Sequence, residues 1–314
     1  MRVCIDIGGT KVAVSLAPDS TVTGTPPPLQ ARRTESTAKT GDDHALARQV
    51  LRLVDEVCAE AKVAPDSITA AGVSSCGPFV LDAQGRIELA APNICGGLAG
   101  PARGLPNDWM SAPLQAPLAE RFKTLRVEND CIAALEAERR WGALRGLQHC
   151  AYVTWSTGIG VGLCVDGRVL RGKHGNAGHA GHMFVSDDDS GALCGCGNVG
   201  DVEGLVAGNA FERRFGQDAS ALLAAAAAGD AQALMRVDEL CRVLGRMLYN
   251  LVATLDLQRV SLGGSVFWHN RELLLPRLQA QVTGKLPALT AGVTLVPAGL
   301  GLGVGDYAAL ALLD

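Results

Sequence analysis

The chain has 314 residues, of which 48% are hydrophobic and 19% are charged, and its formal net charge at pH 7 is −4. This length and apolar content suffice for one or two domains with a sizeable core. No long basic run is present, which argues against a nucleic acid partner held through its phosphates. The most apolar stretches, such as residues 221–229, are too short to cross a bilayer, so we expect no membrane association.

The cysteines and the N-terminus both indicate a reducing compartment. Of ten cysteines, eight occur singly, and only Cys194 and Cys196 lie close together. The first residues, MRVCIDIGGT, enter an apolar run with an early aspartate, which is not the pattern of a signal peptide. Scattered cysteines in such a chain predict reduced, buried thiols and a cytoplasmic location.

The N-terminal half alternates strand-like and helix-like patterns. Residues 2–7 and 12–17 resemble two strands joined by GGTK, which predicts a hairpin. A P-loop or a Rossmann fingerprint would need a helix directly after the glycines. Residues 44–62 have helical spacing, and residues 68–75 resemble a further strand. Residues 76–113 are rich in Gly and Pro and predict a long functional loop region or a domain edge.

The second half repeats the opening device of the first. Strand-like runs at 151–155 and 161–167 flank the turn STGIG, and Gly158 lies 150 positions after Gly8. This spacing is close to half the chain and predicts an internal duplication, with each half begun by a glycine-turn hairpin. The remaining predicted elements are helices at 130–144, 219–228, 231–255 and 305–314, and a strand at 260–266.

The stretch DIGGTK (6–11) carries the first group of candidate binding residues. A glycine pair lets backbone N–H groups approach an anion closely, because no Cβ intervenes. Thr10 can donate its hydroxyl, Lys11 supplies a positive charge, and Asp6 could hold Mg²⁺ through water. The alternative is an ordinary tight hairpin, against which the flanking Asp, Thr and Lys argue.

The stretch STGIGVG (156–162) repeats this logic. Thr157 and the backbone at Gly158 and Gly160 could bind a second phosphate group. Two such turns on matching hairpins are more specific than one. They would suit a nucleoside triphosphate held between the two halves.

Two further motifs are weak when taken alone. Asp130 in END (128–130) stands between a strand pattern and a helix pattern, where it could accept a proton from a substrate hydroxyl, with Asn129 bonding a neighbouring hydroxyl. The alternative for Asn-Asp at this point is a helix N-cap. Gly263 and Gly264 in LGGS follow a strand and could let a nucleobase lie against the backbone.

The order DIGGTK, END, STGIGVG, GHAGH followed by CGCGNVG, and SLGGSV resembles the ROK family of sugar kinases and related repressors over nearly the whole chain. The resemblance implies an α/β, actin/hexokinase-like (ribonuclease H-like) two-domain fold with ATP and sugar in a central cleft. We expect a small domain from 1–113 plus 300–314, and a large domain from 114–299 that carries the zinc-type loop. The repressor branch has an N-terminal helix-turn-helix, for which no room precedes DIGGTK, so the kinase branch is favoured.

The resemblance also implies roles for individual residues. Asp130 matches the catalytic base, and the sugar-binding positions match Asn93, Asn129, His179, His182 and Glu203. The nucleotide-binding positions match Asp6, Gly8, Gly9, Thr10, Thr157, Gly158 and Gly160, and the residue chemistry described above adds Lys11, Gly263 and Gly264 to the candidate nucleotide-binding residues. The implied cofactors are ATP and Mg²⁺, together with a structural Zn²⁺.

Two departures from the family pattern concern the sugar and the zinc. His179 stands where a sugar-contacting Glu is common, which slightly favours an N-acylhexosamine over glucose. The family's zinc ligands are one His and three Cys, but Asp201 replaces the last Cys here, which gives His182, Cys194, Cys196 and Asp201. An aspartate oxygen is a legitimate zinc ligand. The alternative is a loop without zinc, held by hydrogen bonds.

The sequence thus predicts an ATP-dependent kinase that phosphorylates the primary (6-) hydroxyl of a hexose or N-acylhexosamine, with N-acetylmannosamine favoured. Its alternatives are a non-catalytic sugar-sensing regulator of the same fold, and a kinase that uses polyphosphate. We also expect a homodimer or higher homo-oligomer, as is common in the family. The acidic run 187–190 is expected to be a solvated loop tip.

Overall fold

The computed structural model describes residues 1–19, 24–99, 104–185, 187 and 192–313. The chain divides into two compact units. Unit 1 comprises Met1–Trp141, Arg171–Ala177 and Gly303–Asp314, and unit 2 comprises Gly142–Leu170 and Gly178–Leu302. Most of the acidic run predicted as a loop tip lies outside the described residues. Within them, no helix has both the length and the apolar content that a membrane span requires.

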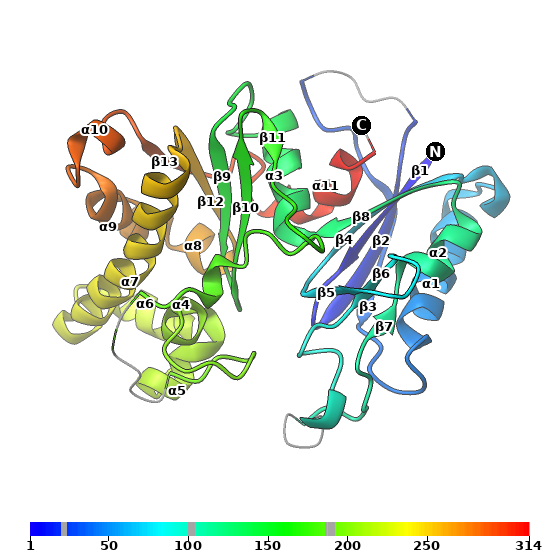
Figure 1. The fold of residues 1–314 in the computed structure, drawn as a ribbon, viewed down its shortest axis with the longest axis horizontal. Helices are drawn as coiled ribbons and strands as arrows, with labels where there is room; N and C mark the ends of the chain where they lie inside the picture. The colour runs from blue at the N-terminus through cyan, green and yellow to red at the C-terminus, as the bar shows by residue number, and fades with distance from the viewer. Residues whose placement is uncertain (20–23, 100–103, 186, 188–191, 314) are drawn as a thin grey trace. The chain divides into compact units, whose positions relative to one another are not determined.

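Unit 1 is built on a five-stranded sheet in the order β3-β2-β1-β4-β8. The first three of these strands pair antiparallel, and β4 and β8 continue the sheet parallel to β1. Figure 1 shows α1 and α2 on one side of this sheet and α3 and α11 on the other. The bounds are β1 Arg2–Ile7, β2 Lys11–Ala17, β3 Gln30–Ser36, β4 Ala70–Ser75, β8 Thr124–Asn129, α1 Ala45–Ala61, α2 Gln115–Arg121, α3 Asp130–Trp141 and α11 Val304–Ala311.

The sequence of β1 explains its central place. A continuous apolar run is expected of a strand that is covered on both faces, and Val3, Ile5 and Ile7 are fully buried. On one side, α1 presents Leu46, Val50 and other buried residues at helical spacing to the sheet. This core holds the β1 end still, and the first glycine turn follows directly.

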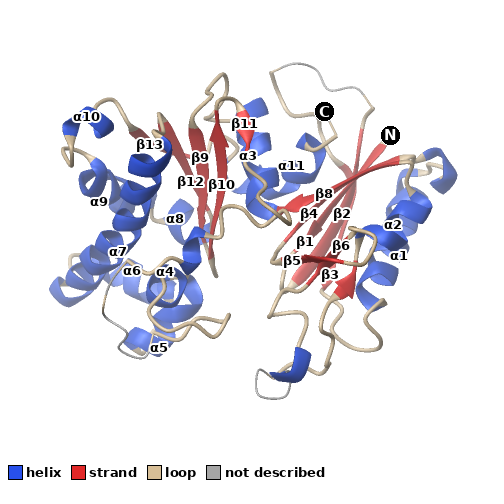
Figure 2. Cartoon of the chain, viewed as in Figure 1, coloured by secondary structure: helices blue, strands red, loops and turns tan. Residues whose placement is uncertain are grey.

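Unit 2 repeats the same sheet with the order β11-β10-β9-β12-β13. Again the first three strands are antiparallel and the last two run parallel to the third. Figure 2 shows its strands in red beside a group of helices. The bounds are β9 Cys150–Trp155, β10 Ile159–Val165, β11 Arg168–Val169, β12 Arg259–Gly263, β13 Thr294–Pro297, α4 Val202–Val206, α5 Phe211–Phe215, α6 Ala219–Ala227, α7 Ala231–Leu255, α8 Ser265–His269, α9 Arg271–Val282 and α10 Pro287–Thr290.

The matching sheets confirm the duplication predicted from the two hairpins. The pair β9–β10 in unit 2 occupies the place of β1–β2 in unit 1, and β12 occupies that of β4. All ten cysteines are free thiols, as predicted, and of the eight that occur singly all but Cys76 are buried.

Three details differ from the sequence predictions. Residues 76–113 are not purely a loop, because they contain a small sheet of β5 (Phe79–Leu81), β6 (Ile87–Leu89) and β7 (Ala112–Pro113). The strand predicted at 260–266 ends at Gly263, because Ser265 already begins α8. Unit 1 extends to Trp141 and not to 113, since β8 pairs with β4 and α3 packs against α11.

Candidate active site and metal centre

In unit 1, three parallel strands bring polar residues to one edge of the sheet. The register pairs Asp6 of β1 with Ser74 of β4, and Ser75 of β4 with Asn129 of β8. Asp130 follows β8 directly and begins α3. Ligands of open α/β sheets bind outside the carboxyl ends of the parallel strands. Residues that are more than 120 positions apart in the sequence therefore meet at the edge where such a site is expected.

Asp130 is held in place by the first turn of its own helix. Its Oδ1 accepts the Cys131 N–H at 2.8 Å, and Asn129 Oδ1 accepts the same N–H at 3.0 Å. The helix-capping alternative for Asn-Asp is thus present in the structure. Burial raises the pKa of Asp130, and the hydrogen bonds from Cys131 and Asn129 offset this only in part. A desolvated, oriented carboxylate of raised pKa is suited to accept a proton.

Asp6 shares the electrostatic environment of Asp130. Burial first, and then the negative charge of Asp130, raise the pKa of Asp6 from 3.8 to about 7. The positive charge of Lys11 and a 3.4 Å hydrogen bond from Ser74 Oγ act in the opposite direction. The pKa values of both carboxyl groups are raised, and a nearby divalent cation would favour the charged form of each.

The raised pKa of Asp6 predicts a pH-dependent stability. The folded state holds this proton more tightly than the unfolded state, so stability falls as the pH rises from about 4 to about 7 and is then level. Asp6→Asn removes this cost. In denaturant titrations without divalent cations, we expect the free energy of unfolding of the variant to rise relative to that of wild type between about pH 4 and about pH 7. The difference should reach roughly 2–4 kcal/mol at pH 7.5.

The exposed carboxyl of Asp66 provides the control, because Asp66→Asn removes a charge outside the site. A difference between Asp6→Asn and wild type that stays constant from pH 5 to pH 8 would contradict the assignment.

The first glycine turn joins β1 to β2. The Gly8 N–H donates to the Lys11 carbonyl at 2.8 Å, and Thr37 Oγ1 donates to the Gly8 carbonyl at 2.7 Å. Thr10 and Lys11 are exposed and available to a ligand. A Cβ at position 9 would lie 2.0 Å from Asn93 Nδ2, so a larger residue there would displace the Asn93 side chain. The structure thus brings Asn93 against this turn, as well as Thr37, which no local sequence pattern singles out.

The second turn, between β9 and β10, is supported by Glu203. Glu203 Oε2 accepts the Ile159 N–H at 2.9 Å. A Cβ at Gly158 would lie 2.7 Å from the same oxygen, so a larger residue there would displace the Glu203 carboxylate from the turn. Ser156 N–H closes the turn on the Gly158 carbonyl at 3.0 Å, with Thr157 between them, and Gly160 lies in β10 opposite Thr154. Glu203, predicted as a sugar ligand, therefore also fixes the second turn.

The glycine pair after β12 has a packing reason of its own. A Cβ at Gly263 would lie 2.4 Å from the Tyr152 hydroxyl oxygen, and one at Gly264 would lie 2.4 Å from the Trp155 carbonyl oxygen. Close approach to β9 alone therefore accounts for both glycines. Their contact with a nucleobase stays a prediction.

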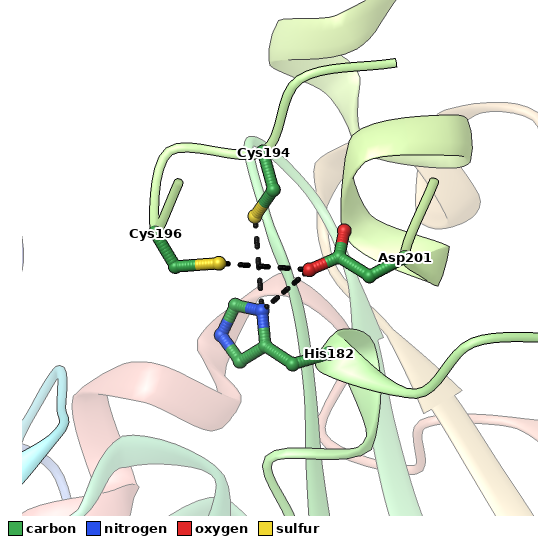
Figure 3. A group of neighbouring side chains, drawn as sticks. All are labelled: His182, Cys194, Cys196 and Asp201. Carbon is green, nitrogen blue, oxygen red and sulfur yellow. Dashed lines mark hydrogen bonds and ion pairs between the residues drawn. The ribbon is translucent and has the colours of Figure 1, made fainter. Parts of the chain in front are cut away.

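Figure 3 shows the four predicted zinc ligands around one point. One donor atom from each of His182, Cys194, Cys196 and Asp201 lies within 4.8 Å of every other. Asp201 Oδ2 is 3.0 Å from His182 Nδ1 and 3.6 Å from Cys196 Sγ, and Cys194 Sγ is 3.7 Å from the same His nitrogen. Tetrahedral zinc with ligand bonds of about 2.0–2.3 Å needs donors ~3.3–3.8 Å apart. The pairs at 3.6 and 3.7 Å meet this spacing, and the pair at 3.0 Å would have to separate by a few tenths of an ångström to share the ion.

Asp201 has a second task at this cluster. It is fully buried, and its Oδ1 accepts the Gly204 N–H at 2.7 Å as the N-cap of α4. Burial raises the pKa of Asp201, but hydrogen bonds from His182 and Gly204 outweigh it, so the pKa is lowered overall. The replacement of cysteine by aspartate thus leaves one oxygen for the helix and one for the cluster.

His179 lies beside the cluster with an unused nitrogen. Its ring contacts that of His182 edge to face, with centroids 6.0 Å apart. Its Nε2 is buried and has no hydrogen-bond partner in the described part of the chain. Burial, and then the charge of His182, lower the pKa of His179. A buried polar atom without a partner is costly, so the free nitrogen indicates a position where a ligand bonds.

The model of the ROK family matches residues 2–312. The chain belongs to the ROK family. An N-acetylmannosamine kinase of Salmonella agona is 32% identical to this ROK chain over 273 residues, which cover 83% of the chain and 82% of the relative.

Solved ROK structures share its fold. The ROK hexokinase of Thermus thermophilus is 31% identical with a TM-score of 0.76, covering 99% of this chain and 97% of that one. The ROK family glucokinase of Streptomyces griseus, in complex with glucose and AMPPNP, is 25% identical with a TM-score of 0.68, covering 98% and 97%. These likenesses confirm the predicted α/β actin/hexokinase-like fold.

Proposed function

We propose that this ROK protein is an ATP-dependent sugar kinase that transfers the γ-phosphate to the primary (6-) hydroxyl of a hexose or N-acylhexosamine. The observation that carries the proposal is the position of Asp130, directly after β8 at the carboxyl edge of the unit 1 sheet that also carries Asp6 on β1. The names of the relatives support the same reaction class, because they are sugar kinases.

Each group has a chemical task in this reaction. Asp130 accepts the proton of the sugar hydroxyl while the oxygen of that hydroxyl attacks the γ-phosphorus and ADP leaves. Asn129 forms a hydrogen bond with a neighbouring hydroxyl of the sugar. The backbone of the two glycine turns, with Thr10, Lys11 and Thr157, holds the phosphates. A Mg²⁺ ion near Asp6 would neutralise charge on the transferred group.

The zinc ligand set has a structural task in this proposal. Four protein ligands leave no open position for water, so the ion would hold the loop that carries His179 and Glu203 rather than take part in the chemistry. Glu203 links the zinc ligand set to the second glycine turn. Its Oε1 lies 3.4 Å from Cys194 Sγ, and its Oε2 accepts the Ile159 N–H of the turn.

For the sugar, we propose N-acetylmannosamine ahead of glucose. The Salmonella relative supports this choice by its name. The unpartnered Nε2 of His179 supports it too, since the ring can hydrogen-bond a neutral substituent on the sugar. The partners expected beyond the sugar and ATP are further copies of the chain, and the cytoplasmic location likewise stays a prediction.

A coupled assay of ADP release tests the proposal. Folded protein with Mg²⁺ and ATP is offered glucose, mannose, N-acetylmannosamine and N-acetylglucosamine. We expect turnover with at least one sugar and the highest kcat/KM with N-acetylmannosamine. Silence on every sugar would refute the kinase. Sugar binding without turnover would favour the regulator, and turnover with polyphosphate alone would favour the other donor.

The role of His179 predicts a change of sugar preference. His179→Glu places a carboxylate where the neutral ring lies, so we expect kcat/KM for N-acetylmannosamine to fall by about tenfold relative to that for glucose. The assay is the same sugar panel. Zinc content is measured alongside, because the ring contacts His182.

The exposed residue His44 provides the matched control, as His44→Glu introduces the same charge outside the site. An unchanged ratio of the two sugars in His179→Glu, with zinc retained, would remove His179 as a specificity residue.

A further inference from the structure

Unit 1 contains an arginine-lined pocket that none of the proposed site residues lines. Its volume is about 420 Å³, within the range of small-molecule sites. Arg126 and Glu128 come from β8, and Glu136, Arg139 and Arg140 come from α3. Arg171 and the end of α11 complete the wall. Segments that are far apart in the sequence thus converge on one concave, charged surface.

The side chains that line this pocket are mostly cationic. They include four arginines and two glutamates, so the lining itself carries a formal charge of +2 in a chain whose net charge is −4. Arg171 contacts Glu128 and lies 3.8 Å from Glu136, which also pairs with Arg139 at 3.2 Å. The two carboxylates therefore hold two of the guanidinium groups in fixed positions.

The other two arginines line the pocket from different elements, β8 and α3. Arg126 of β8 is exposed and makes no hydrogen bond or ion pair to any described residue. Arg140 of α3 is held with its guanidinium 5.2 Å from the centre of the Trp141 ring. An arginine oriented by an aromatic face loses less side-chain freedom when it binds an anion.

The chemistry of such a pocket fits a phosphate ester. Guanidinium groups match phosphate oxygens in pairs, and a phosphomonoester carries about −1.5 to −2 charge at pH 7. We propose that this pocket binds the phosphomonoester of a small molecule, of the sugar phosphate class, at a site distinct from the two glycine turns. A sugar phosphate is also the product class of the proposed reaction, but binding here does not depend on that reaction.

Isothermal titration calorimetry on the full chain at low ionic strength tests the proposal with glucose 6-phosphate, inorganic phosphate and glucose. Wild type is compared with Arg126→Gln and Arg140→Gln. We expect each substitution to weaken glucose 6-phosphate binding by about tenfold, as for one charge-assisted contact. Inorganic phosphate should bind more weakly than the ester, and glucose binding should not respond to either substitution.

Two control variants separate this pocket from other anion sites. Arg242→Gln removes an exposed arginine of α7, and Lys11→Gln removes the cation of the first glycine turn. Both variants should bind glucose 6-phosphate at the arginine-lined pocket as wild type does, whereas the pocket variants lose this binding. Circular dichroism checks the folding of every variant. Arg126→Lys, which keeps the charge without the planar fork, should lie between wild type and Arg126→Gln.

Three results would overturn the proposal. One is wild-type affinity for glucose 6-phosphate in both pocket variants. Another is a loss of that binding in Lys11→Gln alone. The third is inorganic phosphate binding as tightly as the ester, which would exclude an organic ligand as the occupant.

Discussion

Asp130→Asn should abolish turnover while leaving the fold intact. The substitution removes the only proton acceptor that we assign to the sugar hydroxyl, and loss of a general base costs about 10²–10⁴-fold in kcat. The fold should persist, because an amide oxygen can still accept the Cys131 N–H that Asp130 Oδ1 now accepts. Steady-state ADP release and thermal unfolding measure the two effects on the same preparation.

The matched control for Asp130→Asn is Asp230→Asn. Asp230 is the N-cap of α7, where its Oδ1 accepts the Ala233 N–H at 2.8 Å. Asp230→Asn also replaces an aspartate by an asparagine at the start of a helix, but Asp230 is not one of the proposed site residues. Its kcat should equal that of wild type. Near-normal kcat in Asp130→Asn would remove Asp130 as the base.

Asp201→Ala should remove zinc from the protein. Wild type is expected to contain one zinc ion per chain, because four donor atoms of the types that zinc prefers lie within 4.8 Å of one another. The alanine variant loses one ligand and leaves His182 without its partner at 3.0 Å. We expect a loss of about 3–5 kcal/mol in stability, since the binding energy of a structural metal contributes to folding. Metal analysis after dialysis and denaturant titration provide the two readings.

Two further substitutions at position 201 separate zinc from helix capping. Asp201→Cys restores the cysteine usual in the family and should keep the zinc. Asp201→Asn can still cap α4 through Gly204, but it offers a poor zinc ligand and should lose the ion. Loss of a helix cap alone costs about 1 kcal/mol of stability. Asp230→Ala, which removes the N-cap of α7, is the control that shows this cost in the same protein. Equal zinc in wild type and Asp201→Ala would refute the ligand assignment.

The sequence was most informative where local pattern and tertiary role coincide. β1 is a continuous apolar run that ends in a glycine pair, and β9 with STGIG repeats that pattern, so both hairpins and the duplication could be predicted. The cluster of His182, Cys194, Cys196 and Asp201 could be predicted as well, because the resemblance to the family's zinc motif implied these four residues, which lie within one short stretch of the sequence.

The parts that could not be predicted depend on contacts between distant segments. β3 reads QARRTES and is mostly exposed, so it carries no apolar alternation, and only its pairing with β2 makes it a strand. The end of unit 1 at Trp141 follows from the contact of α3 with α11, which no local pattern reports. The link from Glu203 to the Ile159 amide is likewise a long-range contact.

The last helix of the chain has a consequence for how the molecule is made. α11 lies against β1, β4 and α3, and its Val304, Ala308 and Leu310 are buried (Figure 1). During synthesis, β1 therefore lacks its covering helix until the residues of α11 have been made. Unit 2 is nearly continuous in sequence and is complete by Leu302. We expect the second unit to reach native packing first, and the first unit to complete its packing only after α11 has been synthesised, with its apolar sheet face open to chaperones until then.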